Sequence, residues 1–207
     1  MVVAACLPFG IARLLSPTAE PVSHKSGRSG RMQLRPPGAL RDDHAFMAAC
    51  ISCGLCAEVC PPKCIQFHLR DGGSSANTPY IVPEEKSCIL CMKCGEVCPT
   101  NALEKIAYKK EEIIKQVNMG IAQIDRLTCY PWVNTGICGA CGNICPLGKQ
   151  GIRFEFAGIY RPLVQDGCVG CGQCVEVCPH PSLPIRVVAS GMQSIAPHTL
   201  KSGSLPF

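Results

Sequence analysis

Aromatic and charged side chains are scarce in this 207-residue chain, at 5% and 17% of residues. The core is therefore not built mainly from large side chains. Long hydrophobic runs are also lacking. The apolar stretch at residues 2–15, interrupted only by Arg13, is too short for a transmembrane helix, which takes about 20 residues.

Sequence motifs for substrate chemistry are missing as well. The chain has no G-x-G-x-x-G of a dinucleotide site, no C-x-x-C-H of a haem site and no H-E-x-x-H of a zinc protease. Residues 142–149 resemble a phosphate-binding loop, but five residues separate the glycines and Gln150 stands where Ser or Thr is needed. The five histidines are dispersed, although His180 follows Cys178-Pro179 closely enough to influence a site there. We expect no substrate site in this chain.

The charge balance does not indicate a nucleic-acid partner. The formal net charge of +5 treats every cysteine as neutral. If sixteen thiolates bind four iron–sulfur cores, the charge falls to about −3, because ligands lose their protons on binding metal. The basic residues also form no sustained run with interleaved aromatics.

Cysteine is the abundant residue, at 18 of 207. Such a fraction indicates disulfides or metal. Disulfide scaffolds scatter their cysteines, whereas metal sites bunch them. Here sixteen cysteines form four groups, each ending in Cys-Pro. The groups are Cys50, Cys53, Cys56 and Cys60; Cys88, Cys91, Cys94 and Cys98; Cys129, Cys138, Cys141 and Cys145; and Cys168, Cys171, Cys174 and Cys178.

The spacing C-x2-C-x2-C-x3-C-P is typical of [4Fe–4S] ferredoxins. The first three thiolates come from one loop, and in two-cluster proteins the fourth binds the other cluster. This rule predicts four clusters. The predicted sets are Cys50, Cys53 and Cys56 with Cys98; Cys88, Cys91 and Cys94 with Cys60; Cys129, Cys138 and Cys141 with Cys178; and Cys168, Cys171 and Cys174 with Cys145.

Alternatives to this assignment remain at a few positions. Zinc sites usually take two C-x2-C pairs from separate loops, which matches these motifs poorly. The third motif has eight residues between Cys129 and Cys138, which makes Cys129 the least typical ligand. This loop holds the only tryptophan, Trp132, which either covers a cluster or faces a partner. Cys64 is expected to fill a small buried position, with a substitute ligand as the alternative.

The repeat predicts an α+β fold of two tandem bacterial 2[4Fe–4S] ferredoxin-like units, with short strands and helices around the clusters. Residues 44–120 would form the first unit and residues 121–189 the second. Strands are expected at 64–69 and 80–83, and a strand–turn–strand at 151–165. Residues 101–117 are predicted to form a helix.

The terminal segments are expected to lie outside the core. Residues 1–43 are interpreted as an export-signal remnant followed by a linker rich in Ser, Pro, Gly and Arg. The charged segment that normally precedes an export signal is absent, which is consistent with a start codon placed too late. Residues 3–6 weakly match a lipoprotein cleavage box. Residues 190–207 are expected to form a flexible tail.

The segment LRPPGALRDDHAFMAACISCGLCAEVCP (34–61), the stretched third motif ending ICGACGNICP, and the final CVGCGQCVEVCP resemble ferredoxin-type proteins of the NapG/MauM type. The resemblance covers about residues 34–188. It implies a protein on the periplasmic side of the bacterial inner membrane, associated peripherally with it. The implied partners are a membrane-bound iron–sulfur quinol dehydrogenase and a periplasmic redox enzyme. The twin-arginine start of the family is missing here.

The sequence therefore predicts an electron relay with no catalytic residues of its own. Three alternatives stay open. The chain could be the electron-transfer subunit of a molybdenum or hydrogenase-type oxidoreductase. It could be a maturation factor for a periplasmic enzyme. It could also be a binding module built around zinc.

Overall fold

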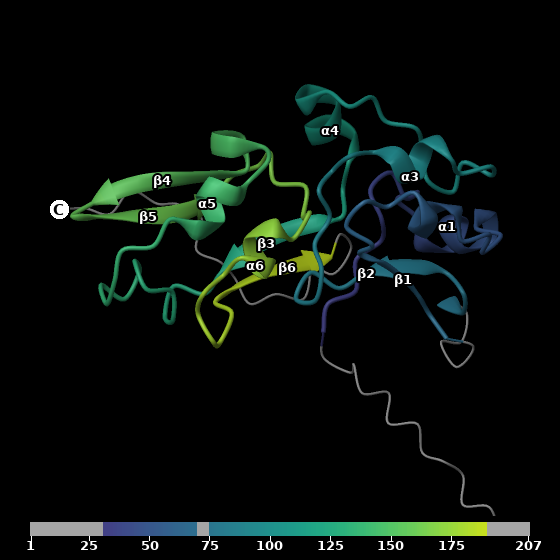
Figure 1. Ribbon diagram of the computed structural model, residues 1–207. Coiled ribbons are helices and arrows are strands. Elements are labelled where there is room, and N and C mark those ends of the chain that lie inside the picture. The colour runs from purple at the N-terminus through teal and green to yellow at the C-terminus, as the bar shows by residue number, and fades with distance from the viewer. Residues whose placement is uncertain (1–30, 70–74, 190–207) are drawn as a thin grey trace, which may run out of the picture. The chain divides into compact units, whose positions relative to one another are not determined.

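A computed structural model describes residues 31–69 and 75–189 (Figure 1). The expectations for the export-signal remnant, the cleavage box around Cys6 and the C-terminal tail fall outside these residues. Within them, every helix is too short or too polar to cross a membrane.

The first half of the described chain is built on a β-hairpin. Strand β1 (Ile65–Phe67) pairs with β2 (Pro79–Ile81) in antiparallel register. On the other edge of β2, Leu34 exchanges two backbone hydrogen bonds with Ile81, at 2.9 and 2.8 Å. Helix α1 (Asp43–Ala49) is capped by Asp42, whose carboxylate accepts hydrogen bonds from two free N–H groups in the first turn of the helix.

Residues 34–40 belong to the core, although the sequence placed them in a linker. Leu34 is fully buried, and Ala39 pairs with Leu103 in an isolated bridge. Arg35 donates to the Thr78 hydroxyl at 2.8 Å and lies over the Phe46 ring. The segment is rich in Pro and Gly because it makes these contacts through a turn that needs Gly38 at φ 81°.

The helix predicted over residues 101–117 is largely wrong. Only α4 (Lys110–Gln116) is helical. Residues 101–103 instead pair with the N-terminal segment, since Leu40 donates its N–H to the carbonyl of Ala102 and Leu103 forms the bridge with Ala39. These tertiary hydrogen bonds replace the helical ones that the local sequence favours. Ile113 and Val117 are nevertheless buried in the core.

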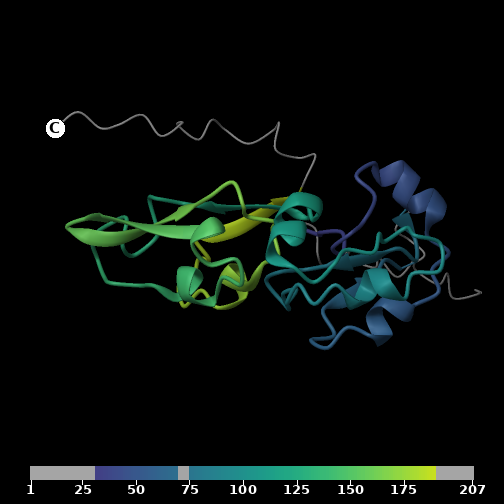
Figure 2. The ribbon, with the colours of Figure 1, turned by 90° about the horizontal axis from the view of Figure 1, so that it is seen from above.

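The second half repeats the plan of the first. Strand β3 (Gly120–Ile124) precedes the third cysteine motif and pairs antiparallel with β6 (Ile185–Ala189), which follows the fourth motif. Between them lies the hairpin of β4 (Ile152–Ala157) and β5 (Ile159–Val164). In the first half, the single Ala39–Leu103 bridge takes the place of the β3–β6 pair. Figures 1 and 2 show β3 and β6 between the β4–β5 hairpin and the part that carries α1.

The core is small and rich in sulfur. Among the described residues only Phe46 and Tyr80 are buried aromatic side chains, which confirms that large side chains do not build it. The buried cysteines are Cys56, Cys60, Cys64, Cys88, Cys94, Cys171 and Cys174. Short strands and helices around inward-pointing thiols confirm the α+β class predicted from the repeat.

Candidate iron–sulfur centres

Three of the four cysteine motifs share one backbone conformation. In each, the second and fourth residues after the first cysteine have positive φ. These residues are Ser52 and Gly54, Leu90 and Met92, and Gly170 and Gly172. A left-handed conformation costs a residue other than glycine about 1–2 kcal/mol, so Leu90 and Met92 keep it only because their surroundings require it.

Each of these loops leads directly into one turn of helix. The helices are α2 (Leu55–Glu58), α3 (Lys93–Glu96) and α6 (Gln173–Glu176). Each holds the third cysteine of its motif, and the fourth cysteine follows the helix. In the first two motifs, the turn after the fourth cysteine also contains a left-handed residue, which is Lys63 in the first motif and Asn101 in the second. The local sequence thus turns the fourth cysteine away from the other three, as the two-cluster rule requires.

Backbone N–H groups already point at several of the thiols. Leu90 donates to the Cys88 sulfur at 3.3 Å, Leu103 to the Cys98 sulfur at 3.4 Å, and Ala122 to the Cys168 sulfur at 3.4 Å. Donors of this kind stabilise thiolates and offset the negative charge of a cluster. The donor chemistry of the chain therefore fits iron–sulfur clusters.

The first set of thiols lies around one apolar space. Cys50, Cys53, Cys56 and Cys98 line it, together with Phe46 and other residues. Burial is the main cause that raises the pKa of Cys56 to about 11, with smaller contributions from Cys50 and Cys53. Across the described residues, no three His, Cys, Asp or Glu side chains meet closely enough to bind a single metal ion.

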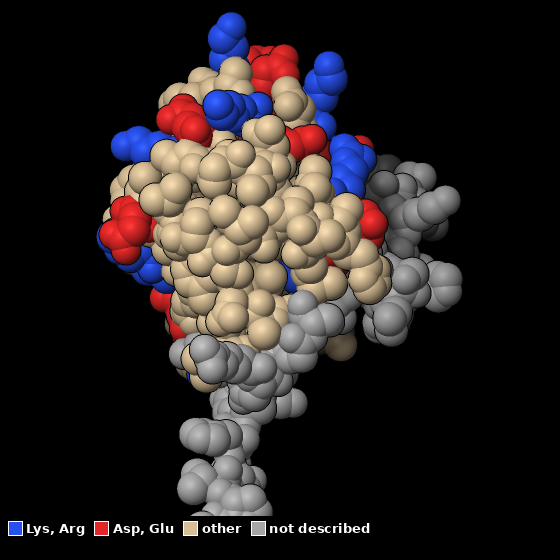
Figure 3. Space-filling model, turned by 90° about the vertical axis from the view of Figure 1, so that its right-hand side faces the viewer, with Lys and Arg blue, Asp and Glu red and all other residues tan. Residues whose placement is uncertain are grey.

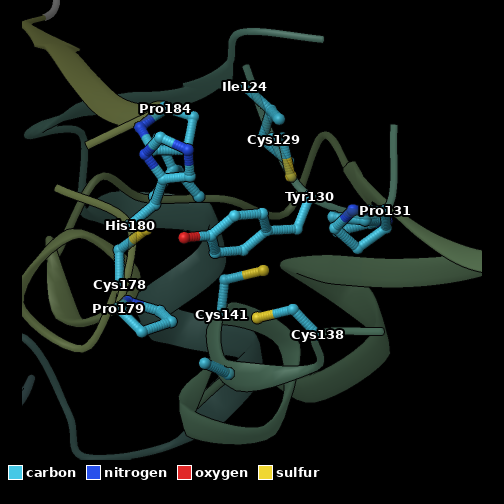
Figure 4. A pocket seen from close by; sticks show the side chains of 13 residues that line it. Ile124, Cys129, Tyr130, Pro131, Cys138, Cys141, Cys178, Pro179, His180 and Pro184 are labelled. Atoms are coloured by element: carbon cyan, nitrogen blue, oxygen red, sulfur yellow. The ribbon is translucent and has the colours of Figure 1, made fainter. Parts of the chain in front are cut away.

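A second apolar space is lined by Cys129, Cys138, Cys141 and Cys178 (Figure 4). Burial raises the pKa of Cys141 to about 12, with further contributions from Cys129 and Cys138. The Tyr130 ring projects among these side chains toward His180, and the two ring centres are 4.5 Å apart. The motif spacing does not mark Tyr130, although Tyr130 directly follows the predicted ligand Cys129.

In the other two sets, burial and neighbouring thiols raise the pKa values of the central cysteines. Burial, followed by Cys91, raises the pKa of Cys94 to about 12, with smaller contributions from Cys56 and Cys60. Burial likewise raises the pKa of Cys171 to about 12, followed by Cys168 and Cys145. The structure thus gathers the first and third predicted sets, each around one space, and the membership of the other two sets stays a prediction. The binding of iron by all four sets stays a prediction.

Cys64 lies against the second set. It is 1% exposed, and its sulfur is 3.5 Å from that of Cys60. The Cys88 side chain is also near enough to influence the pKa of Cys64. With both neighbours protonated, Cys88 lowers the pKa of Cys64 most. Burial raises this pKa and Cys60 lowers it further, so that the pKa of Cys64 is about 7. The small buried position expected for Cys64 is therefore also a contact with two predicted ligands.

The loops of the second and fourth motifs touch each other. The Cys88 N–H donates to the Cys171 carbonyl at 3.0 Å, and Gln173 Nε2 donates to the Cys88 carbonyl at 3.1 Å. Beside them, Glu176 accepts from the Ser87 N–H at 2.7 Å and from Lys86 Nζ at 2.9 Å.

These contacts place the four sets in a spatial order. The second set also lies beside the first, because α3 with Cys94 contacts α2 with Cys56. The fourth set lies beside the third, because α6 with Cys174 contacts α5 with Cys141. The spatial order is therefore first, second, fourth, third, which differs from the order of the motifs along the chain.

The first set reaches the surface. Among the described cysteines only Cys53 is exposed, and residues 45–57 around it contain no charged side chain. Ile51 is 62% exposed and Leu55 44%. Figure 3 shows the side of the molecule on which α1 lies in Figure 1. It has a broad uncharged centre with Lys, Arg, Asp and Glu side chains around its rim.

The long loop of the third motif is anchored by Trp132. Its indole N–H donates to the Pro162 carbonyl at 3.2 Å, and its ring lies under Arg126 at 4.2 Å and near Arg161 at 5.5 Å. Tyr130 and Pro131 line the thiol space, and Trp132 does not belong to that lining. Trp132 thus anchors the loop to β5.

The residues that resembled a phosphate-binding loop instead form α5 (Ala140–Ile144) and the turn to η2 (Gly148–Gln150).

Comparisons with known proteins agree with this geometry. The family of 4Fe-4S dicluster domains matches residues 49–102 and 87–149, and a second 4Fe-4S dicluster family matches residues 124–179.

Three curated relatives cover most of the chain. The "Ferredoxin-type protein NapG" of Escherichia coli is 32% identical over 169 residues, which are 76% of this chain and 71% of the relative. The NapG of Haemophilus influenzae is 32% identical over 167 residues, and the match spans 58% of its length. The "Methylamine utilization ferredoxin-type protein MauM" of Paracoccus denitrificans is 31% identical over 194 residues, 89% of this chain and 80% of the relative.

Proposed function

Because this chain belongs to the family of ferredoxin-type proteins that includes NapG and MauM, we propose that it relays electrons from a membrane-bound, quinol-oxidising iron–sulfur partner to a periplasmic oxidoreductase. The family is that of iron–sulfur electron-transfer proteins, and two dicluster domains account for four [4Fe–4S] clusters. When bound, each cluster supplies a one-electron redox centre.

The proposed ligands are the sixteen cysteines of the four motifs, in the sets given above. We also propose that residues 44–120 and 121–189 are the two cluster-bearing units, with residues 34–40 packed onto the first. The support is the repeated architecture, since in both halves a pair of outer segments flanks a central hairpin.

One observation carries the relay: the hydrogen bond from Cys88 to Cys171 joins the inner ends of the two units. It leaves the first and third sets as the outer members of the row. An electron carrier needs such an arrangement, because a partner can then approach each outer set while the inner sets connect them. A chain that only stored or delivered clusters would not require the inner loops to meet.

The two outer sets also lie near surfaces suited to partners. The uncharged surface around Cys53 covers the first set. Beside the third set, Leu127 is 85% exposed and Ile137 is 88% exposed, and residues 127–148 carry no charged side chain. Exposed apolar residues near a redox centre are typical of interaction surfaces. We propose that each partner docks at one of these two surfaces.

The proposed location is the periplasmic side of the inner membrane, with peripheral association through the membrane partner. The support is the resemblance to the NapG and MauM family, which implies this location. The electron-transfer subunit of a larger oxidoreductase and a maturation factor are the competing functions.

Deletion of the gene separates these functions. A relay predicts that the periplasmic enzyme matures with its full cofactor content but loses quinol-dependent turnover, while turnover with an artificial donor remains. Loss of the mature enzyme would instead show a maturation role. Stable co-purification with a large catalytic subunit would show the third function.

A further inference from the structure

We propose that Cys64 stays unbound to iron and donates a hydrogen bond to the sulfur of Cys60, a ligand of the second cluster, which raises the reduction potential of that cluster. This inference rests on the proposed ligand set, in which Cys60 and Cys88 both bind that cluster. It assigns a role to a seventeenth cysteine, which the ligand motifs leave unused.

The contacts of Cys64 are with two ligands of the same cluster. Its sulfur lies 3.5 Å from that of Cys60, and the Cys88 side chain is near enough to influence the pKa of Cys64. All three side chains are buried, at 1%, 7% and 6% exposure. Water is therefore not available at this position to replace the thiol as a donor.

The direction of the hydrogen bond follows from the chemistry of the ligands. Cys60 and Cys88 lose their protons when they bind iron, so their sulfurs can only accept. Among these three thiols, only Cys64 then keeps an S–H to donate. A hydrogen bond to a ligand sulfur favours the more negative, reduced state of a cluster, and it therefore raises the potential.

The first cluster supplies a natural comparison. Cys64 follows the left-handed residue Lys63, and Ala102 follows the left-handed residue Asn101 at the same place after the fourth cysteine of its motif. Ala102 is also 1% exposed. The turn therefore needs only a small buried side chain, and an alanine satisfies its packing. The thiol at position 64 adds a donor that the turn itself does not require.

Cys60 and Cys98, the fourth cysteines of the first two motifs, also differ in the side-chain donors near them. The Cys98 sulfur has the Thr100 hydroxyl 3.8 Å away. At the matching position before Cys64 the chain has Pro62, which offers no side-chain donor. The thiol of Cys64 thus supplies a side-chain donor beside Cys60, where Pro62 offers none.

The test uses the full-length holoprotein, purified without oxygen, as wild type and as Cys64→Ala. Iron and sulfide are counted, and the potentials are measured by titration followed with low-temperature paramagnetic resonance. The variant should keep about sixteen irons while one potential falls. We expect about a tenfold shift of that one-electron equilibrium, which corresponds to about 59 mV. The potential that moves should belong to the signal that Cys91→Ala removes.

Two further variants act as controls. Cys64→Ser keeps a donor and should hold the potential nearer to the wild-type value than Cys64→Ala does. Ala102→Cys places a thiol beside the first cluster and should raise the potential of the signal that Cys53→Ala removes.

Two results would overturn the inference. Loss of about four irons in Cys64→Ala would show that Cys64 is a ligand. Full iron content with four unchanged potentials would show that it only fills space. Either result leaves the relay intact, whereas a wild-type protein without iron would refute the proposed function itself.

Discussion

The backbone N–H of Cys88 donates to the carbonyl oxygen of Cys171 at 3.0 Å, although the two residues belong to different cysteine motifs. Gln173, 85 residues away from Cys88 in sequence, returns a hydrogen bond to the Cys88 carbonyl. This joint brings the second and fourth thiol sets together and makes a continuous row of four.

Glu176 stabilises this joint, so Glu176→Ala should weaken it. The carboxylate accepts hydrogen bonds from Ser87 and Lys86, and these donors lower its pKa although burial alone would raise it. Because the side chain is partly exposed, we expect a loss of only about 1 kcal/mol. The midpoint of urea unfolding of the holoprotein measures it. Glu96→Ala, at the same position of α3, is the matched control and should leave the midpoint unchanged.

The same carboxylate predicts a pH dependence. Since its pKa is lower in the folded protein, its contribution is present above the ordinary value of 4.5 and is lost as pH falls through the folded pKa. The difference in unfolding midpoint between wild type and Glu176→Ala should therefore shrink below about pH 4.5. A difference that grows as the pH falls would contradict this assignment.

Removal of the Cys53 thiol, the exposed one among the described cysteines, should cost one cluster. Cys53→Ala is expected to lower the iron content by about four of sixteen atoms and to destabilise the first unit, because cluster binding and folding are linked. Metal analysis and thermal unfolding measure both effects. Ser52→Gly is the control, since Ser52 is exposed and has φ 57°. It should keep all its iron and lose no stability, and iron loss there would contradict the proposed role of the loop.

Gly54 and Gly172 occupy the same motif position with φ near 80–85°, but their surroundings differ. A Cβ at Gly54 would meet nothing within 4 Å, whereas a Cβ at Gly172 would lie 2.6 Å from the Pro83 Cβ. Gly54→Ala should therefore cost about 1–2 kcal/mol from backbone strain alone. Gly172→Ala should cost about 2–4 kcal/mol, because overpacking adds to the strain. Equal losses in denaturant unfolding would show that the contact with Pro83 is not rigid.

Cluster incorporation should depend on pH. Burial first, and neighbouring thiols next, raise the pKa values of Cys94, Cys141 and Cys171 to about 12. Each of these ligands must then release a proton on binding iron, so anaerobic reconstitution should be more complete at pH 8.5 than at pH 6.5. Proton release measured with an indicator dye checks this, and a pH-independent yield would refute it.

The raised pKa values have the opposite pH effect on the folding stability of the iron-free protein: stability falls as pH rises. A raised pKa means that the folded state favours the neutral thiol. The stabilisation is present below the ordinary value of about 9 and is lost as pH rises through about 12. Unfolding of the iron-free chain should therefore become easier at strongly alkaline pH.

Sequence reasoning succeeded where the structure is local. The spacing of Cys50, Cys53 and Cys56 places three thiols on one loop. It failed at residues 101–109, where an apparently helical pattern is overruled by the bridge between Leu103 and Ala39. It also missed β3 and β6, which pair with each other although the third and fourth motifs separate them in the chain.

The amino-acid sequence by itself determined which thiols share a loop, and hence the kind of cofactor, because a few residues of backbone suffice to set that geometry. Only the tertiary structure decided that the four sets follow the order first, second, fourth, third, and that Cys64 lies between Cys60 and Cys88. These features depend on contacts such as that of Cys88 with Cys171. Such contacts join residues far apart in the chain, and no spacing within a motif specifies them.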